Sequence, residues 1–260
     1  MLFQAFVLAY AAVFGLIVGS YLNVVIYRLP RHLSTVLPRS RCPGCGAPIR
    51  ARDNLPVVSW LLLGGRCRDC GARISPRYPL IEAATAALFV GCVAAFGVSV
   101  AAVAAALFGS LLIALAAIDV EHLLLPDRLT LPGIAIGFAL QPFLPWGGWR
   151  SALLGALLGG GILLALSAAW LLLRGEEGMG MGDVKMLAMI GAFLGWKGMA
   201  VTLFSASLLG AIVGLALLGR SRAGFKTKLP FGAFLSLGGL FALFAGRPLV
   251  DLYLSSLRPL

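Results

Sequence analysis

Residues 99–118 read SVAAVAAALFGSLLIALAAI and are followed directly by Asp119. These 20 residues carry no charge, and an α-helix of that length crosses the ~30 Å hydrocarbon core of a bilayer. In lipid a helix satisfies all of its backbone hydrogen-bonding groups internally. The segment therefore predicts a membrane-spanning helix with an aspartate at its end.

Similar apolar segments recur along almost the whole chain of 260 residues, of which 60% are hydrophobic and only 12% charged. An ordinary soluble domain is about 45–50% apolar, so we predict an all-α polytopic membrane protein. The first segment has no basic n-region and no small-residue cleavage site, so we expect it to remain as a span. Eight spans are predicted, at residues 3–27, 79–97, 99–118, 129–145, 151–173, 184–197, 199–218 and 230–250.

Residues 28–77 form the one large polar interruption and contain ten arginines against two acids, a local net charge of +8. Basic residues collect in cytoplasmic loops, so we expect this segment in the cytoplasm. Alternation of the spans places loops 119–128, 174–183 and the basic loop 219–229 on the same side. The net charge of +11 therefore reflects membrane topology, and we expect membrane lipid rather than nucleic acid as a partner.

This polar loop contains Cys42-Pro-Gly-Cys45 and Cys67-Arg-Asp-Cys70, each followed by glycine and separated by 21 residues. Four thiolates can surround one zinc ion tetrahedrally, and a glycine after each second cysteine lets the backbone turn beneath the metal. We predict a structural Zn²⁺ bound by Cys42, Cys45, Cys67 and Cys70, because no ligand position remains for water. The alternative is a pair of disulfides, which a reducing cytoplasm disfavours.

Two aspartates lie at predicted helix ends on the cytoplasmic side. Asp119 ends the 99–118 span, and Asp183 closes the run GMGMGD at 178–183 before the 184–197 span. Ionisable groups at a membrane border are costly and are therefore functional candidates. Two aspartates that share one proton can activate water for attack on a peptide bond, so we predict an aspartic peptidase pair. The alternative is that Asp183 caps a helix and Asp119 is a loop acid.

The sequence lacks the motifs of other peptidase classes. The sequence has no Gly-x-Ser-x-Gly or His-Glu-x-x-His motif, and its only histidines, His32 and His122, lie in predicted loops. Asp127 precedes the 129–145 span and is expected to cap that helix.

The order of several motifs resembles the type IV prepilin peptidase family of membrane aspartic peptidases. The motifs are GSYLNVVIYRLP at 19–30, the two cysteine pairs, DNLPVVSWLLLGGRCRDCGARISPRYPLIE at 53–82, IDVEHLLLPDRLTLP at 118–132, GMGMGDVKMLAMIGAFLGW at 178–196 and LPFGAFLS at 229–236. Together they cover most of the chain, and their order is more specific than any one of them.

The resemblance implies that Asp119 and Asp183 are catalytic and that the enzyme faces the cytoplasm from the bacterial inner membrane. Its substrates would be type IV prepilins and type II secretion pseudopilins, cleaved after a glycine that ends a short basic leader. The family with this cysteine loop commonly methylates the new amino terminus, usually phenylalanine, with S-adenosylmethionine. The implied parts are a first helix at 1–27, a zinc-binding domain at 28–78 associated with methyl transfer, and a seven-helix peptidase domain at 79–260.

Two alternatives remain open at the level of sequence. One is a leader peptidase without methyltransferase activity, since no Gly-x-Gly-x-x-Gly loop or other residue can be assigned to a methyl donor. The other is a proton-coupled transporter regulated by the zinc loop, for which acids nearer mid-span are expected. Glu121, Glu176 and Glu177 are expected to be solvated loop charges, or else to attract the basic leader.

Overall fold

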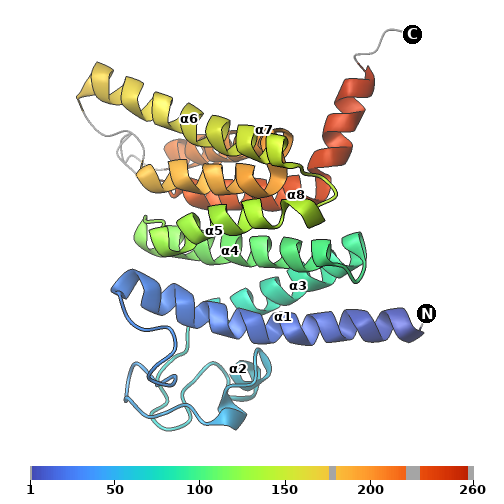
Figure 1. The fold of residues 1–260 in the computed structure, drawn as a ribbon. Coiled ribbons are helices and arrows are strands. Elements are labelled where there is room, and N and C mark those ends of the chain that lie inside the picture. The colour runs from blue at the N-terminus through green and yellow to red at the C-terminus, as the bar shows by residue number, and fades with distance from the viewer. Residues whose placement is uncertain (1, 176–179, 221–228, 257–260) are drawn as a thin grey trace. The chain divides into compact units, whose positions relative to one another are not determined.

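The computed structural model describes residues 2–175, 180–220 and 229–256, and its elements in these residues are helices (Figure 1). The helices are α1 (Leu2–Arg28), α2 (Val58–Leu62), α3 (Arg77–Phe96), α4 (Val100–His122), α5 (Asp127–Ala139), α6 (Trp149–Arg174), α7 (Met181–Arg220) and α8 (Phe231–Ser256). They form two compact units, Met1–Ala106 and Leu107–Leu260, with the boundary inside α4. The prediction of an all-α protein is confirmed.

Six of the described helices are long and apolar enough to cross a membrane, namely α1, α3, α4, α6, α7 and α8. Eight spans were expected, and one difference lies at 129–145. There α5 has only 13 residues, which corresponds to about 20 Å of helix. A short 3-10 turn at Gln141–Phe143 follows it, since Pro142 disfavours α-helical geometry at the residue before it.

The second difference concerns 184–197 and 199–218, which lie together in α7. The candidate membrane span in this element has 37 residues, about twice the length that a bilayer requires. Its backbone leaves the helical region at Gly195, where φ is 70° and ψ is 180°. A positive φ of this kind costs glycine little and other residues more, so Gly195 divides α7 into two helices.

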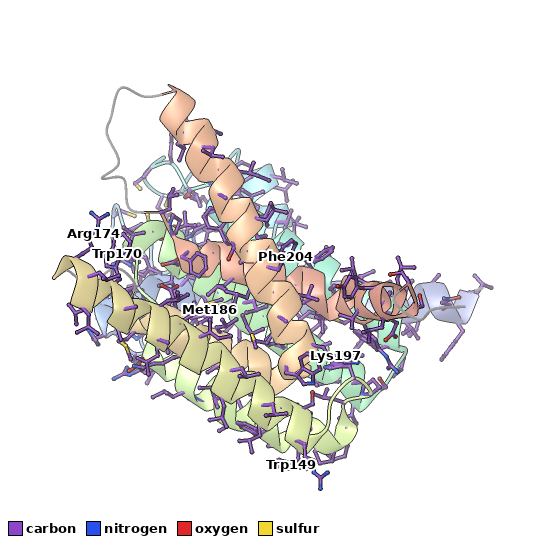
Figure 2. The ribbon with its side chains drawn as sticks, turned by 90° about the horizontal axis from the view of Figure 1, so that it is seen from above. Trp149, Trp170, Arg174, Met186, Lys197 and Phe204 are labelled. Atoms are coloured by element: carbon purple, nitrogen blue, oxygen red, sulfur yellow. The ribbon has the colours of Figure 1, made fainter. Side chains whose placement is uncertain are left out.

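Contacts with α6 show that the chain reverses at this break. A Cβ atom at Gly159 would lie 2.8 Å from the Leu187 carbonyl oxygen and 3.1 Å from Met199 Cγ. Residues on both sides of the break therefore lie beside the same point of α6. Figure 2 shows the chain doubling back after Lys197 toward Phe204. The two expected spans are the antiparallel halves of α7.

The segment after α5 satisfies the backbone at the end of the first half of α7. Gln141, which is 3% exposed, donates from Nε2 to the Ala192 carbonyl at 2.6 Å. Its Oε1 accepts the Gly148 N–H at 2.8 Å, and Trp146 Nε1 donates to the Phe193 carbonyl at 3.2 Å. Buried backbone groups at a helix break need such partners, because no water or helix turn satisfies them there.

Replacing Gln141 by leucine is expected to lower the free energy of unfolding by about 2–4 kcal/mol, because it removes the hydrogen-bond donor of the buried Ala192 and Phe193 carbonyls. The measurement is thermal or denaturant unfolding of the purified protein in detergent. Gln4→Leu is the matched control, since Gln4 is exposed on α1. Equal stability of the two variants would contradict this role of Gln141.

In the first unit, α1 and α3 pack through small residues. A Cβ atom at Gly15 would lie 2.7 Å from Ala86 Cα, and one at Gly19 would lie 2.7 Å from Glu82 Cα. Both distances are shorter than real Cβ contacts, so these positions admit only glycine at this helix separation. Close backbone approach of this kind is typical of helix pairs in lipid, where dispersion contacts drive association.

Candidate active site and metal centre

The two cysteine pairs have the same local structure. Cys42 N–H donates to the Ala47 carbonyl at 2.9 Å, and Cys67 N–H donates to the Ala72 carbonyl at 2.8 Å. The glycines that follow the second cysteines have positive φ values, +71° at Gly46 and +70° at Gly71. The expectation that these glycines turn the backbone beneath a metal therefore agrees with the observed conformation.

The four cysteine sulfurs converge on one point. The Sγ atoms all lie within 4.8 Å of one another, and Cys42 Sγ is 3.8 Å from Cys70 Sγ. A tetrahedral zinc with Zn–S bonds of about 2.3 Å requires sulfurs about 3.8 Å apart, so this donor set fits zinc. Backbone N–H groups of Cys45 and Gly44 lower the pKa of the Cys42 thiol to about 7. All four cysteines are free, and the cluster can hold a metal.

Polar contacts hold the cysteine loop together and connect it to α3. Arg68 binds Asp53 through Nη2 at 2.7 Å, and this guanidinium holds the pKa of the Asp53 carboxyl below its usual range. Glu82 of α3 is 7% exposed, and its Oε2 accepts the Val57 N–H at 2.7 Å. Glu82 thus anchors the loop to a membrane helix, a role that sequence analysis did not assign.

In the second unit, Asp119 lies at the end of α4 against the first turn of α8. Its side chain is buried, with 5% exposure, and Oδ2 accepts the Ala233 N–H at 3.0 Å. A Cβ atom at Gly232 would lie 2.9 Å from the same oxygen. The absence of a side chain at Gly232 is therefore what lets the α8 backbone reach the carboxylate.

Asp183 lies in the first turn of α7 and its N–H donates to the Gly180 carbonyl at 3.1 Å. Leu125 lies beside this turn and beside α8, because Cβ atoms at Gly182 and Gly232 would lie 2.8 Å and 2.9 Å from Leu125 atoms. The turn that carries Asp183 and the start of α8, which contacts Asp119, therefore both pack against Leu125.

Asp127 does not cap α5 as expected. The N-cap residue is Pro126, without a side-chain cap, and Asp127 is the first residue of the helix. Lys185 of α7 donates from Nζ to both Asp127 carboxylate oxygens, at 2.7 and 2.8 Å. Asp127 pairs with a lysine 58 residues away because the start of α7 lies beside the start of α5. The sequence around Asp127 does not reveal this neighbour. Glu176 and Glu177 lie outside the described residues.

The first turn of α8 was missed as a functional element by sequence reasoning, although LPFGAFLS at 229–236 was noted as a family motif. The available signal was a glycine placed within the first turn of an apolar helix. Such a position suggests a close backbone approach. Its partner, Asp119, is 114 residues away, so only the tertiary structure identifies it.

The predicted catalytic role of Asp119 implies that replacing Gly232 by alanine lowers turnover by about 10²-fold, because the new methyl group would displace Asp119 Oδ2 and small misplacements of this kind have large effects on catalysis. The measurement is the rate of substrate cleavage in membranes at matched protein level. Gly246→Ala is the control, since its Cβ would meet Ala242 Cβ at an ordinary 3.4 Å. Equal activity of both variants would show that the contact is dispensable.

These observations define a class: a multi-pass membrane protein with a four-cysteine cluster that could hold a metal in one unit and an aspartate at the end of α4 and another at the start of α7 in the other. Comparison with known protein families supports this class. A family model described as "Bacterial Peptidase A24 N-terminal domain" matches residues 13–96, and one described as "Type IV leader peptidase family" matches residues 106–215. No solved structure matches the chain.

Relatives named "Prepilin leader peptidase/N-methyltransferase" align over nearly the full chain. One from Burkholderia pseudomallei is 42% identical over 93% of this chain and 86% of its own length. Those from Stutzerimonas stutzeri and Pseudomonas aeruginosa are each 41% identical, over 98% and 96% of this chain and 96% and 94% of their own lengths. The chain therefore belongs to the type IV prepilin peptidase family, and it is an enzyme of the prepilin leader peptidase/N-methyltransferase type.

Proposed function

We propose that Asp119 and Asp183 are the catalytic pair with which this enzyme removes the basic leader of prepilins and pseudopilins, after a glycine. The observation that carries the proposal is that the turn with Asp183 and the first turn of α8, which contacts Asp119, both pack against Leu125. Aspartates that share one proton provide an acid and a base at the same site.

In this mechanism the ionised carboxylate of the pair takes a proton from a water molecule, which attacks the carbonyl carbon of the scissile glycine. The protonated carboxyl group donates its proton to the carbonyl oxygen as the tetrahedral intermediate forms. When the intermediate collapses and the C–N bond breaks, the carboxyl group that took the proton of water donates it to the leaving nitrogen, and the other carboxylate takes back a proton from the hydroxyl group that becomes the new carboxyl end. The leaving amine receives a proton and becomes the amino terminus of the mature pilin. The N–H of Ala233 holds Asp119 Oδ2 in position at 3.0 Å.

The second activity follows from the family to which the chain belongs. Methyl transfer needs a donor of the S-adenosylmethionine type, which supplies an electrophilic methyl group to the free amine of the mature pilin. We assign this activity to the part of the chain at 28–78, where the four cysteines would hold a structural Zn²⁺. The zinc would order the loop, since it has no open coordination position for chemistry.

The same proposal places the site at the cytoplasmic face of the bacterial inner membrane. Support comes from the +8 charge of residues 28–77 and from the rule that basic loops stay inside. Asp119, the start of α7 and the start of α8 share one end of the second unit. Both the leader and the aspartates then meet at the membrane border.

The proposed function is tested with the purified chain in lipid vesicles and a prepilin that has a Gly–Phe junction. Mass spectrometry should detect one cleavage, after the glycine, and the mass of one methyl group on the mature product only when S-adenosylmethionine is present. Cleavage without methylation, also on a previously cleaved pilin, would support the alternative of a leader peptidase alone. Absence of cleavage, or cleavage at another bond, would overturn the proposal.

A further inference from the structure

A buried polar cluster lies in the first unit, where α1 and α3 join the cysteine loop. Asn23 of α1 is 2% exposed and Glu82 of α3 is 7% exposed. A Cβ atom at Gly19, one turn before Asn23, would lie 2.7 Å from Glu82 Cα. Asn23 Nδ2 donates to the carbonyl of Tyr78, one turn before Glu82, at 3.0 Å. The side chains of Asn23 and Glu82 therefore lie on adjacent turns of a tightly packed helix pair.

The amide oxygen of Asn23 is unsatisfied. Nδ2 donates to the carbonyls of Tyr78 at 3.0 Å and Gly19 at 3.4 Å, whereas the buried Oδ1 has no hydrogen-bond partner among the described residues. The opposite amide orientation would place an oxygen against two carbonyl oxygens, so these contacts fix which atom is the acceptor. A buried acceptor without a donor is destabilising, and an N–H group of a ligand would satisfy it.

Glu82 holds a strained turn of the cysteine loop. Its Oε2 accepts the Val57 N–H at 2.7 Å. Val57 has φ 61° and ψ −49°, and Val58 N–H donates to the Pro56 carbonyl at 2.6 Å. This is a γ-turn of the rare, strained kind, centred on a β-branched residue. Such strain gathers at functional sites. The donor to Glu82 is an uncharged backbone group, so a cation would bind this buried carboxylate more strongly.

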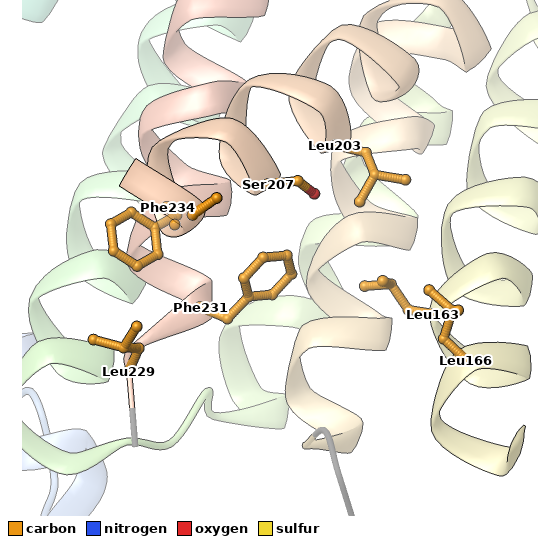
Figure 3. Close-up of a pocket in the computed structure, with 9 residues that line it drawn as sticks. Leu163, Leu166, Leu203, Ser207, Leu229, Phe231 and Phe234 are labelled. Atoms are coloured by element: carbon orange, nitrogen blue, oxygen red, sulfur yellow. The ribbon is translucent and has the colours of Figure 1, made fainter. Parts of the chain in front are cut away.

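The chemistry of these two groups selects an amine. An amide oxygen and a carboxylate together suit a ligand with several N–H donors and a positive charge, as a primary ammonium ion has. The enzyme produces such a group when cleavage exposes the amino terminus of the mature pilin. The apolar groove of the second unit, between α6, α7 and α8 (Figure 3), has Ser207 as the one polar side chain in its lining and no charged one. That groove therefore offers no countercharge for an ammonium ion.

We propose that Asn23 and Glu82 bind the amino terminus of the mature pilin and that Glu82 is the base for its methylation. This rests on the proposed placement of methyl transfer in the cysteine loop, to which Glu82 is joined through Val57. Glu82 takes one proton from the bound ammonium ion and later releases it to solvent. The freed lone pair attacks the methyl carbon of a donor of the S-adenosylmethionine type. The C–N bond forms as the C–S bond breaks, and the electron pair of that bond leaves sulfur as a neutral thioether.

The first experiment compares Glu82→Gln with Asp69→Asn in vesicles, using a previously cleaved pilin. Glutamine still accepts the Val57 N–H but can neither attract the ammonium ion nor take its proton. We expect methyl transfer at pH 7 to fall about 10²-fold, with prepilin cleavage within about twofold of the wild type and the zinc content unchanged. Asp69 is 39% exposed and pairs with Arg50, so Asp69→Asn should match the wild type. Unchanged methyl transfer in Glu82→Gln would overturn the proposal.

The pH dependence separates catalysis from anchoring. An amino terminus has a pKa of about 8 and is already neutral at about pH 9.5, so the defect of Glu82→Gln should there shrink to within about fivefold. On the elements packed against Glu82 the neighbours are Gly19 and Asn23 of α1 and Val57 of the loop, and none of them titrates. An equal defect at both pH values, or joint loss of cleavage and zinc, would show that Glu82 only anchors the loop and would overturn its role as base.

A third measurement uses the unsubstituted enzyme. An apolar carbodiimide activates buried carboxyl groups, and an amine in contact with one then forms an amide bond as a urea leaves. Mass spectrometry should find Glu82 joined to the amino terminus of the cleaved pilin, and an acetylated amino terminus should give no product. Amide bonds at other carboxyl groups only would overturn the proposal. If replacing Cys42 and Cys67 stops methyl transfer while Glu82→Gln does not, the placement of this activity in the loop stands and the amine site alone fails.

Discussion

Replacing either Asp119 or Asp183 by asparagine is expected to lower the rate of prepilin cleavage by about 10³-fold or more. Asparagine retains the shape of the side chain but can neither accept the proton of water nor donate one to the leaving amine. Loss of an acid–base group typically costs about 10²–10⁴-fold, and groups that act as a unit can cost more. The measurement is cleavage in membranes at equal protein level.

Asp127→Asn is the control for this experiment. Asp127 also lies at a helix start, but its carboxylate pairs with Lys185 and is 54% exposed. An exposed ion pair contributes about 0–1 kcal/mol, so this variant should cleave within about fivefold of the wild type. Normal cleavage by either Asp119→Asn or Asp183→Asn would show that the active site has been assigned to the wrong acids.

Replacing Cys42 and Cys67 together by serine is expected to abolish zinc binding and to disorder the loop between α1 and α3. Structural zinc contributes about 10–16 kcal/mol to the folding of small domains, more than the loop's exposed ion pairs contribute. The purified wild type should contain about one zinc ion per chain by elemental analysis. The double variant should contain none, and its loop should be cut by protease far faster.

Cys92→Ala separates the loss of the metal from the general effect of removing a thiol. Cys92 is fully buried in α3 and lies outside the four-cysteine cluster, so this variant should retain its zinc and its resistance to protease. Retention of zinc by the Cys42 and Cys67 double variant would contradict the assigned ligands. Methyl transfer to a previously cleaved pilin would report whether the metal loop supports the second activity.

The membrane helices and the cysteine cluster of this protein can be predicted from short stretches of sequence. An uncharged run such as 99–118 specifies a membrane helix because lipid leaves the backbone few alternatives. The cysteine cluster is equally local: two residues between cysteines and a glycine after each pair fix the knuckles, which have the same hydrogen bonds in the structure. Even the expectation of separate spans at 184–197 and 199–218 matches the two halves of α7.

Other features depend on contacts between segments far apart in the chain. Hydropathy did not show that Gln141 would support the break in α7, that Asp127 would pair with Lys185 instead of capping α5, or that α8 would reach Asp119 through Gly232. Each contact joins residues whose own neighbours in sequence are compatible with several arrangements. Helix packing selects one of them, because buried polar groups must find partners and close backbone approaches must find glycine. The sequence by itself determined the helices and the chemistry available to them, whereas the tertiary structure decided which groups meet.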